Sequence, residues 1–255
     1  MSEPALPGSG AIALGFDPGD VVIVTGAGSG IGAATARNAA SVGLRVAAWD
    51  LVPDGVAATV RAIAAAGGEA IALTADVADK QAVAGALQRS EEQLGRARFL
   101  VNNAGPASGS ELDFDRALTI AVGSMRAVAH QWLERGALGG AALVNVASVA
   151  GNLIGTSPDW YPAAKAGIMG YTRHLAAYRG DVVRANAVAP GMTDTPRLAA
   201  FKASELGRQV VERIPLKRLA SPDEIAWAIL FLLSPLASYI NGVLLTVDGG
   251  WTVTQ

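Results

Sequence analysis

Hydrophobic positions along the chain follow two alternating patterns. Short apolar runs, often β-branched, predict about seven strands, at residues 21–25, 45–49, 70–74, 98–101, 143–147, 182–188 and 243–247. Ala-rich stretches with helical spacing of apolar residues predict helices at residues 31–41, 54–66, 79–94, 112–135, 160–178 and 222–233. This alternation predicts an α/β fold, a doubly wound parallel sheet with helices on both faces. Ligands bind such sheets at the carboxyl ends of the strands, so we expect function in the loops there.

Length and composition favour one domain. A chain of 255 residues with 51% hydrophobic content can bury a full core. We expect a flexible tail rich in Gly and Pro over residues 1–19 and a single domain over residues 20–255. The first 19 residues have no basic leader and no apolar stretch of signal-peptide length, and the most apolar segment, 225–233, is too short to cross a membrane. A cytoplasmic protein is therefore expected.

Charge, cysteine and histidine content narrow the function classes. A net charge of −2 with 16% charged residues provides no basic stripe for nucleic acid and no polybasic segment for a membrane surface. The absence of cysteine excludes disulfides and thiolate chemistry. His130 and His174 lie in predicted helices without partners at metal-binding spacing, so no metal site is expected. Asp113 and Asp115 are better explained as favouring a helix start than as a catalytic carboxylate pair.

A glycine-rich turn, TGAGSGIG over residues 25–32, follows the first predicted strand and opens the first helix. Glycines permit a tight turn and a close approach of the backbone to a pyrophosphate, and unpaired amides at the helix start favour the anion. An ordinary glycine-rich turn is the alternative explanation, but the strand–turn–helix context favours dinucleotide binding. The candidate cofactor contacts here are Gly26, Ser29, Gly30, Ile31 and Gly32.

Asp50 ends the second predicted strand, 18 positions after Gly32. At about this distance an acidic residue accepts hydrogen bonds from the adenosine ribose of NAD. The phosphate of NADP would be repelled there, and neither Ser29 nor Leu51 offers a cation to offset the repulsion. The alternative to ribose binding is structural: Asp50 ends a strand at a turn. We predict NAD as the cofactor.

Five motifs in one order resemble the short-chain dehydrogenase/reductase family, over essentially residues 18–255. They begin with the glycine turn and continue with an adenine-contacting segment, an Asn-Asn-Ala-Gly motif, a turn whose threonine holds the nicotinamide carboxamide and a C-terminal Asp-Gly-Gly. The resemblance implies a Rossmann-type fold. It also implies cofactor contacts at Asp76, Val77, Asn103, Ala104, Gly105, Pro190, Gly191 and Thr193.

Tyr161 and Lys165 lie four positions apart at the start of a predicted helix and therefore share one helical face. Tyrosine is a poor base near neutral pH because its ordinary pKa is about 10, but a neighbouring ammonium stabilises the phenolate and lowers that pKa. Alone, such a pair is more often a structural surface pair. Beside the cofactor motifs, we predict Tyr161 as the catalytic acid/base. The resemblance further implies that Lys165 contacts the nicotinamide ribose.

Ser148 follows the fifth predicted strand, 13 positions before Tyr161, and matches the family's catalytic serine. Its hydroxyl can polarise a substrate carbonyl, whereas the structural alternative is a serine satisfying a strand-end turn. We therefore expect hydride transfer between the nicotinamide and the substrate carbon, with Tyr161 moving the proton to or from oxygen.

One position departs from the family pattern. In the family, an asparagine of the fourth helix lets that helix hold a water that relays protons from the lysine. Here Ala121, or Ile120 in the neighbouring register, stands at that position. A backbone carbonyl serves part of that role if the helix is locally opened, and a water or the Ser124 hydroxyl is a candidate for the rest. A weaker departure is Ala164, where the family often has serine.

The substrate pocket is predicted to be apolar and covered by a mobile lid over residues 195–207. Loop packing or subunit contact would explain the same hydrophobic residues equally well. The candidate pocket residues are Leu153, Ile154, Trp160, Met192, Leu198 and Phe201.

We thus predict an NAD(H)-dependent enzyme that interconverts a secondary alcohol and a ketone, on an apolar alicyclic or aromatic substrate. The alternative from another class is a catalytically weak NAD-binding regulatory or scaffold protein, which the missing asparagine makes less improbable. Reduction of a C=C bond is a third reading, which Ser148 and the Tyr161–Lys165 spacing disfavour. Helices 112–135 and 160–178 are expected to pair between subunits in a homodimer or homotetramer.

Overall fold

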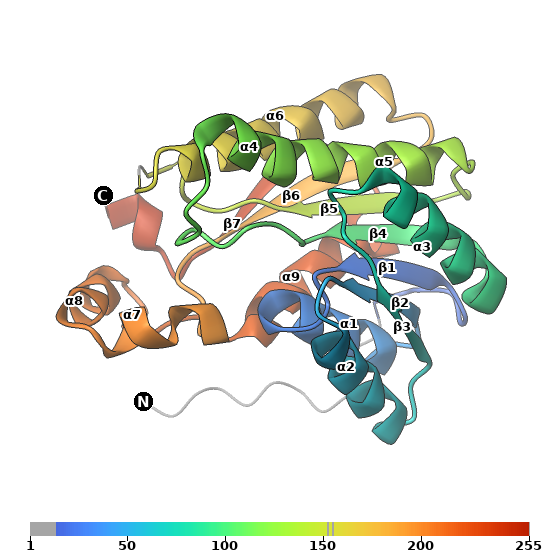
Figure 1. The fold of residues 1–255 in the computed structure, drawn as a ribbon, viewed down its shortest axis with the longest axis horizontal. Helices are drawn as coiled ribbons and strands as arrows, with labels where there is room; N and C mark the ends of the chain where they lie inside the picture. Colours follow the sequence, from blue (N-terminus) through green and yellow to red (C-terminus); the bar gives the residue numbers. More distant parts are fainter. Residues whose placement is uncertain (1–13, 152, 155, 255) are drawn as a thin grey trace.

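The computed structural model describes residues 14–254 except 152 and 155. Its seven strands form one parallel sheet in the order β3-β2-β1-β4-β5-β6-β7 (Figure 1). The predicted single-domain, Rossmann-type doubly wound sheet is therefore confirmed. The strands are β1 (Val21–Thr25), β2 (Arg45–Asp50), β3 (Ala70–Thr74), β4 (Ala97–Asn102), β5 (Ala142–Val146), β6 (Arg184–Pro190) and β7 (Leu244–Val247).

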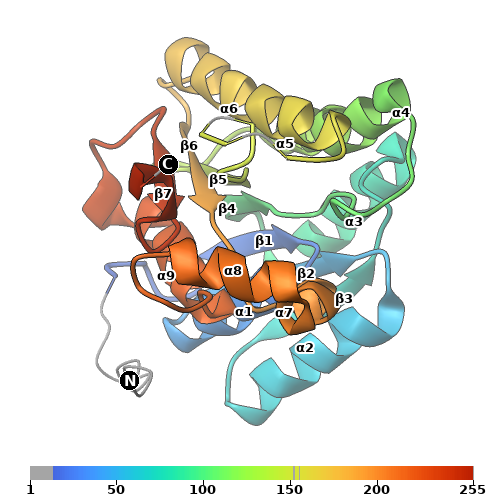
Figure 2. The same ribbon diagram turned by 90° about the vertical axis from the view of Figure 1, so that its left-hand side faces the viewer.

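Helices cover both faces of the sheet and bury two separate hydrophobic clusters (Figures 1 and 2). Helices α1 (Gly30–Ser41), α2 (Pro53–Ala65) and α9 (Pro222–Leu233) cover one face. Helices α3 (Lys80–Leu94), α5 (Ser124–Glu134) and α6 (Trp160–Tyr178) cover the other. Because the strands are buried on both sides, each reads as a nearly continuous apolar run.

The predicted helix over residues 112–135 is three elements. It consists of α4 (Phe114–Leu118), a π-helical turn η1 (Thr119–Gly123) and α5. Asp113 sets the start, because its side chain accepts a hydrogen bond from Arg116 N at 2.8 Å. The π turn passes straight into α5, which is why hydrophobic spacing does not reveal it. In this turn the regular α-helical hydrogen bonds around Ala121 are replaced by π-helical ones. The helix is therefore locally opened at the position where the family has its asparagine.

Residues 14–19 correct the predicted tail boundary. Phe16 packs edge-on against Phe99 with ring centroids 5.2 Å apart, and Asp17 pairs with Arg98 at 2.6 Å. Leu14 also packs against the core. These six residues are therefore attached to the domain, and the rest of the predicted tail, residues 1–13, lies outside the described residues.

The segment predicted as a lid is largely helical. It contains the turn η2 (Pro196–Leu198), α7 (Ala199–Ala203) and the start of α8 (Glu205–Arg213). These helices lie beyond the carboxyl ends of the strands, across from α4 and α6 (Figure 1). Within the part of the chain that the structure describes, no helix is both long and apolar enough to span a bilayer.

Candidate active site

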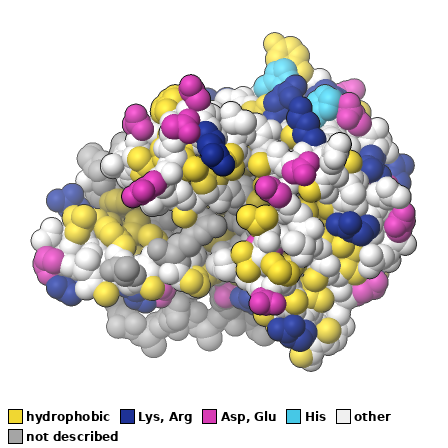
Figure 3. All heavy atoms as spheres, in the orientation of Figure 1, with side chains coloured by type: hydrophobic (Ala, Val, Ile, Leu, Met, Phe, Trp, Pro, Cys, Tyr) yellow, Lys and Arg dark blue, Asp and Glu magenta, His cyan; other side chains and the backbone are white. Residues whose placement is uncertain are grey.

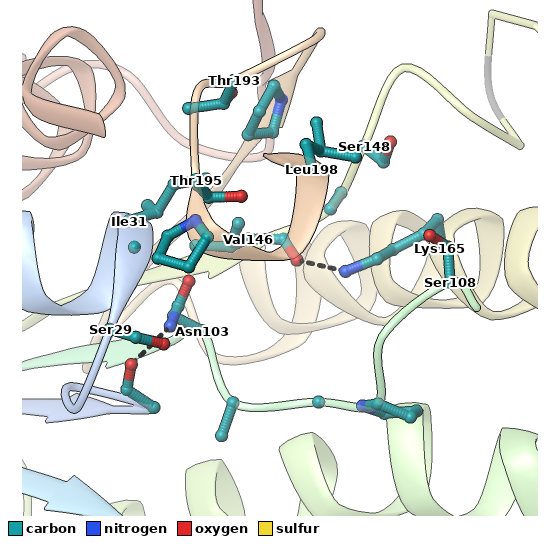
Figure 4. Close-up of a pocket in the computed structure, with 18 of the residues that line it drawn as sticks. Ser29, Ile31, Asn103, Ser108, Val146, Ser148, Lys165, Thr193, Thr195 and Leu198 are labelled. Carbon is teal, nitrogen blue, oxygen red and sulfur yellow. Dashed lines mark hydrogen bonds between the residues drawn. The ribbon is translucent and has the colours of Figure 1, made fainter. Parts of the chain in front are cut away.

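A cleft of about 290 Å³ lies at the carboxyl ends of the strands (Figure 4). On the molecular surface, a hollow separates the α4 side from the α7–α8 side, with hydrophobic side chains along its edge (Figure 3). Most of the residues singled out from the sequence meet in this cleft. They are Gly26, Ser29, Gly30, Ile31, Asp50, Asn103, Ala104, Gly105, Ser148, Tyr161, Lys165, Pro190, Gly191, Thr193 and Leu198.

The glycine turn is shaped as a cradle for an anion. Gly26 has a left-handed φ of 67°, and a Cβ placed there would come within 2.7 Å of Asn103 Nδ2. A Cβ on Gly32 would lie only 2.0 Å from the carbonyl oxygen of Gly26. Ser29 precedes α1 without a side-chain hydrogen bond to the helix amides, so those amides can face a ligand. The residues present therefore fit the pyrophosphate of a dinucleotide.

Thr25 holds this cradle against the loop after β4. Its Oγ1 accepts hydrogen bonds from the backbone amides of Asn103 (3.0 Å) and Ala104 (3.1 Å) and donates to Val101 O at 3.2 Å. The Asn103 side chain donates to the carbonyl oxygens of Thr25 and Gly26, both at 3.1 Å. Sequence reasoning missed Thr25 as a site residue, although a threonine that ends an apolar strand before a glycine turn was a usable signal.

Asp50 closes the far end of the cleft. Its Oδ2 accepts from Gly28 N at 2.7 Å and its Oδ1 from Val52 N at 2.9 Å. The carboxylate thus ends the strand at a turn, as the structural alternative held, and it also lines the cleft. Each oxygen retains a lone pair for a ribose hydroxyl.

Lys165 and Tyr161 come from the first turns of α6, and Ser148 follows β5. Lys165 Nζ donates to the carbonyl oxygen of Val146 at 3.0 Å and lies 5.6 Å from the centroid of the Tyr161 ring. An ammonium at this distance favours a phenolate by Coulomb attraction. Ser148 Oγ accepts a hydrogen bond from Ala150 N at 3.2 Å, which leaves its O–H to donate.

Ala121 lies in the π turn and is 5% exposed. It packs in a small cluster with Ala117, Trp160 and Ala164, where the short alanine side chains make room for the indole. The Ser124 hydroxyl donates to Ile120 O within the helix, so it is already engaged.

Three predicted cofactor residues lie outside the cleft lining. Gly32 is buried behind the glycine turn. Asp76 is exposed and its Oδ1 accepts from Ala78 N at 2.9 Å, which makes a local turn. Val77 is half-buried against the core.

The predicted substrate pocket is only partly assembled. Leu198 lines the cleft. Trp160, 1% exposed, does not border it, because its ring turns into the alanine cluster beside α4. Met192 instead lines a separate cavity of about 110 Å³ beside Leu216.

The remaining pocket candidates also lie outside the cleft lining. Leu153 is about half exposed, and Ile154 forms a backbone bridge with Ala150. Phe201 is half-buried in α7. The lining also includes Thr195 and Pro196 from the predicted lid. Sequence reasoning missed the remaining lining residues, Val52, Pro106, Ser108, Val146 and Ala147.

Comparison with known proteins identifies the class. A family model described as "Enoyl-(Acyl carrier protein) reductase" matches residues 26–252. The chain belongs to the short-chain dehydrogenase/reductase family of enzymes, oxidoreductases that bind a nicotinamide cofactor.

Among its relatives, the chain is 40% identical over 241 residues to cis-4-hydroxycyclohexanecarboxylate dehydrogenase of Sinomonas cyclohexanicum, covering 91% of this chain and 96% of that one. It is 37% identical over 246 residues to D-threitol dehydrogenase of Mycolicibacterium smegmatis, covering 92% and 94%. A solved short-chain dehydrogenase from Burkholderia cenocepacia, in complex with NADP, superposes with a TM-score of 0.83 at 31% identity and covers 92% of this chain and 98% of its own.

Proposed function

We propose that this enzyme interconverts a secondary alcohol and a ketone with NAD(H), using Tyr161 as the general acid/base. One observation carries the proposal: Lys165 Nζ lies 5.6 Å from the Tyr161 ring in the cleft that also contains Ser148 and the glycine cradle. The pair is therefore placed beside a dinucleotide site, unlike a surface pair at the same spacing.

Each of the three side chains has a distinct role in this reaction. A nicotinamide cofactor held by the glycine cradle would supply the hydride chemistry at the substrate carbon. Ser148 donates its O–H to the substrate oxygen, because accepting a hydrogen bond from Ala150 N leaves that proton available. Tyr161 gives a proton to that oxygen in ketone reduction and takes one from it in alcohol oxidation. Lys165 is held by Val146 O and stabilises the phenolate form of Tyr161.

The preference for NAD(H) rests on the charge around Asp50. Its neighbours Leu51 and Val52 are apolar and exposed, and among the described residues that line the cleft, Lys165 at the other end is the only Lys or Arg. A 2′-phosphate would therefore meet a carboxylate with no described cation in the lining to offset it.

We propose an apolar alicyclic or aromatic substrate because Leu198 and Pro196 line the cleft with apolar side chains. The relative from Sinomonas cyclohexanicum, whose name specifies a hydroxylated cyclohexane ring, is consistent with this class. The relative named for D-threitol marks the competing class, an open-chain polyol.

A substrate screen tests this function. Cyclohexanone, acetophenone and erythrulose would each be mixed with NADH, and consumption would be followed at the nicotinamide absorbance, with NADH binding measured in parallel. We expect the cyclic or aromatic ketones to be reduced faster than erythrulose. A faster rate with erythrulose would exclude the apolar substrate class.

The competing function is a catalytically weak NAD-binding regulatory or scaffold protein, which the alanine at position 121 favours. The π turn argues for activity, because an opened helix presents backbone carbonyls whatever its side chains. We expect Ala121→Asn to change turnover by less than about tenfold, under about 1.4 kcal/mol in barrier. Because Ala121 is packed against Trp160, the larger asparagine should overpack this cluster, and we expect the variant to have a lower melting temperature as well.

Ala117→Asn is the matched control for this variant, because Ala117 lies in the same cluster but outside the π turn. Both variants should lose stability. If the unmodified protein bound NADH without turning over any carbonyl, and Ala121→Asn but not Ala117→Asn restored turnover, the regulatory function would replace the enzymatic one.

We also propose a homo-oligomer, with a contact surface in addition to the predicted pairing of helices 112–135 and 160–178. The exposed side chains of α5 and α6 are largely polar, including Arg126, His130 and His174. In contrast, α9 is apolar on every side from residue 225 to 233, yet Trp227 is only half-buried and Phe231 is exposed. It packs beside β7, an edge strand. A helix that is apolar on all sides is normally buried. A second copy of the chain that covers α9 and β7 would bury the exposed apolar side chains of this helix.

A further inference from the structure

The cleft has two chemically different ends. In Figure 4, Ser108, Ser148 and Lys165 lie at one end, and Ser29 and Asn103 lie at the other. The second end is the glycine cradle, so the first end is where the substrate meets the reacting groups.

Most polar side chains in the lining already have a partner or a role. Asn103 braces the glycine cradle, and the Thr193 hydroxyl donates to Gly191 O at 3.2 Å. Ser148 has the role proposed above. The hydroxyl of Ser108 makes no hydrogen bond within the described part of the chain, and no step of the proposed reaction uses it.

The backbone holds Ser108 in a defined place. Ser110 N donates to Ala107 O at 2.9 Å, which closes a tight turn with Ser108 and Gly109 at its two central positions. Just beyond the turn, Leu112 packs against the Trp160 cluster. Ser108 is exposed to solvent and lines the cleft from this turn.

The rest of this end of the cleft limits what the hydroxyl can meet. Leu198 lines the cleft with an apolar side chain, which suits a hydrocarbon ring. Among the described lining residues, the only Lys or Arg is Lys165, whose Nζ donates to Val146 O and serves Tyr161. A carboxylate on the substrate would lack a dedicated cation here, whereas a neutral oxygen needs only a hydroxyl partner.

We propose that Ser108 is a specificity-determining residue that hydrogen-bonds a second, neutral oxygen on the substrate, remote from the reacting carbon. The inference rests on the proposed function and narrows its substrate class to ring alcohols and ketones that carry an additional hydroxyl or carbonyl group. Because this bond lies away from the reacting carbon, it contributes mainly to substrate binding and so acts on KM more than on kcat.

The test compares kcat/KM for 4-hydroxycyclohexanone, cyclohexanone and 4-oxocyclohexanecarboxylate in the unmodified protein and in Ser108→Ala. We expect the hydroxyketone to exceed cyclohexanone by about fivefold, the size of one neutral hydrogen bond. Ser108→Ala should bring that ratio close to one, mostly through KM. Ser110→Ala, two positions along the same loop and outside the cleft lining, is the matched control and should keep the ratio.

The possible outcomes distinguish the proposed role of Ser108 from the proposed alcohol/ketone activity. If the ketones are reduced but the ratio survives in Ser108→Ala, the role of Ser108 is wrong and the alcohol/ketone function stands. If the carboxylate is the best substrate of the unmodified protein, the neutral-oxygen specificity is wrong. If NADH binds and none of the ketones is reduced, the proposed function and this inference both fall.

Discussion

Replacing Tyr161 with phenylalanine is expected to lower turnover by at least about a hundredfold while the protein still folds and binds NADH. The substitution removes only the hydroxyl, which is the proton donor to the substrate oxygen, and keeps the ring that packs edge-on against Trp160 at 5.5 Å. Steady-state turnover, circular dichroism and NADH fluorescence titration would measure the three properties separately.

Tyr178→Phe is the matched control, because Tyr178 ends the same helix and is 75% exposed, outside the cleft lining. Its turnover should be normal. Lys165→Ala should impair both turnover and cofactor binding. Normal turnover by Tyr161→Phe across the pH range would assign the acid/base role to another group.

NAD(H) is expected to be preferred over NADP(H) by about tenfold or more in kcat/KM, equivalent to about 1.4 kcal/mol. Asp50→Ala should narrow the ratio by removing the charge. Because Asp50 also accepts from Gly28 N, the alanine variant should weaken binding of both cofactors. Asp50→Asn separates the two effects, since it removes the charge but keeps an oxygen acceptor for Gly28 N.

Asp54→Asn, in the first turn of α2 and outside the cleft lining, serves as the control for loss of a nearby negative charge. It should leave the cofactor ratio nearly unchanged. Equal efficiency of the unmodified protein with NAD(H) and NADP(H) would remove the basis for assigning Asp50 this role.

The fold was predictable where local signals and burial agree. The bounds of α9 follow from Pro222 in its first turn and from a capping box in which Ser221 and Glu224 satisfy each other's backbone amides. The strands were readable because burial on both faces makes each an apolar run. The predicted tail extended too far because Phe16 and Asp17 are ordered by Phe99 and Arg98, about 80 residues away in sequence, which no local pattern records.

The cleft was predictable where a motif fixes the backbone and less so where side-chain packing decides. Gly26 and Lys165 lie where the motifs placed them, because a left-handed turn and the helical spacing from Tyr161 leave little freedom. Trp160 was misplaced because its direction depends on Ala117 and Ala121, which make room on the α4 side. Ser108 escaped notice because a serine in a loop has no distinctive pattern until the structure shows it lining the cleft.

The most direct test of carbonyl chemistry follows deuterium from NADH deuterated on the transferred position of nicotinamide C4 into cyclohex-2-enone, a substrate that offers both a C=O and a C=C bond. Mass spectrometry and NMR of the product would locate the label. We predict deuterium on the carbinol carbon of cyclohex-2-enol, with the Tyr161→Phe variant forming little of it. Deuterium at C3 of cyclohexanone would contradict the account, since it would show reduction of the C=C bond.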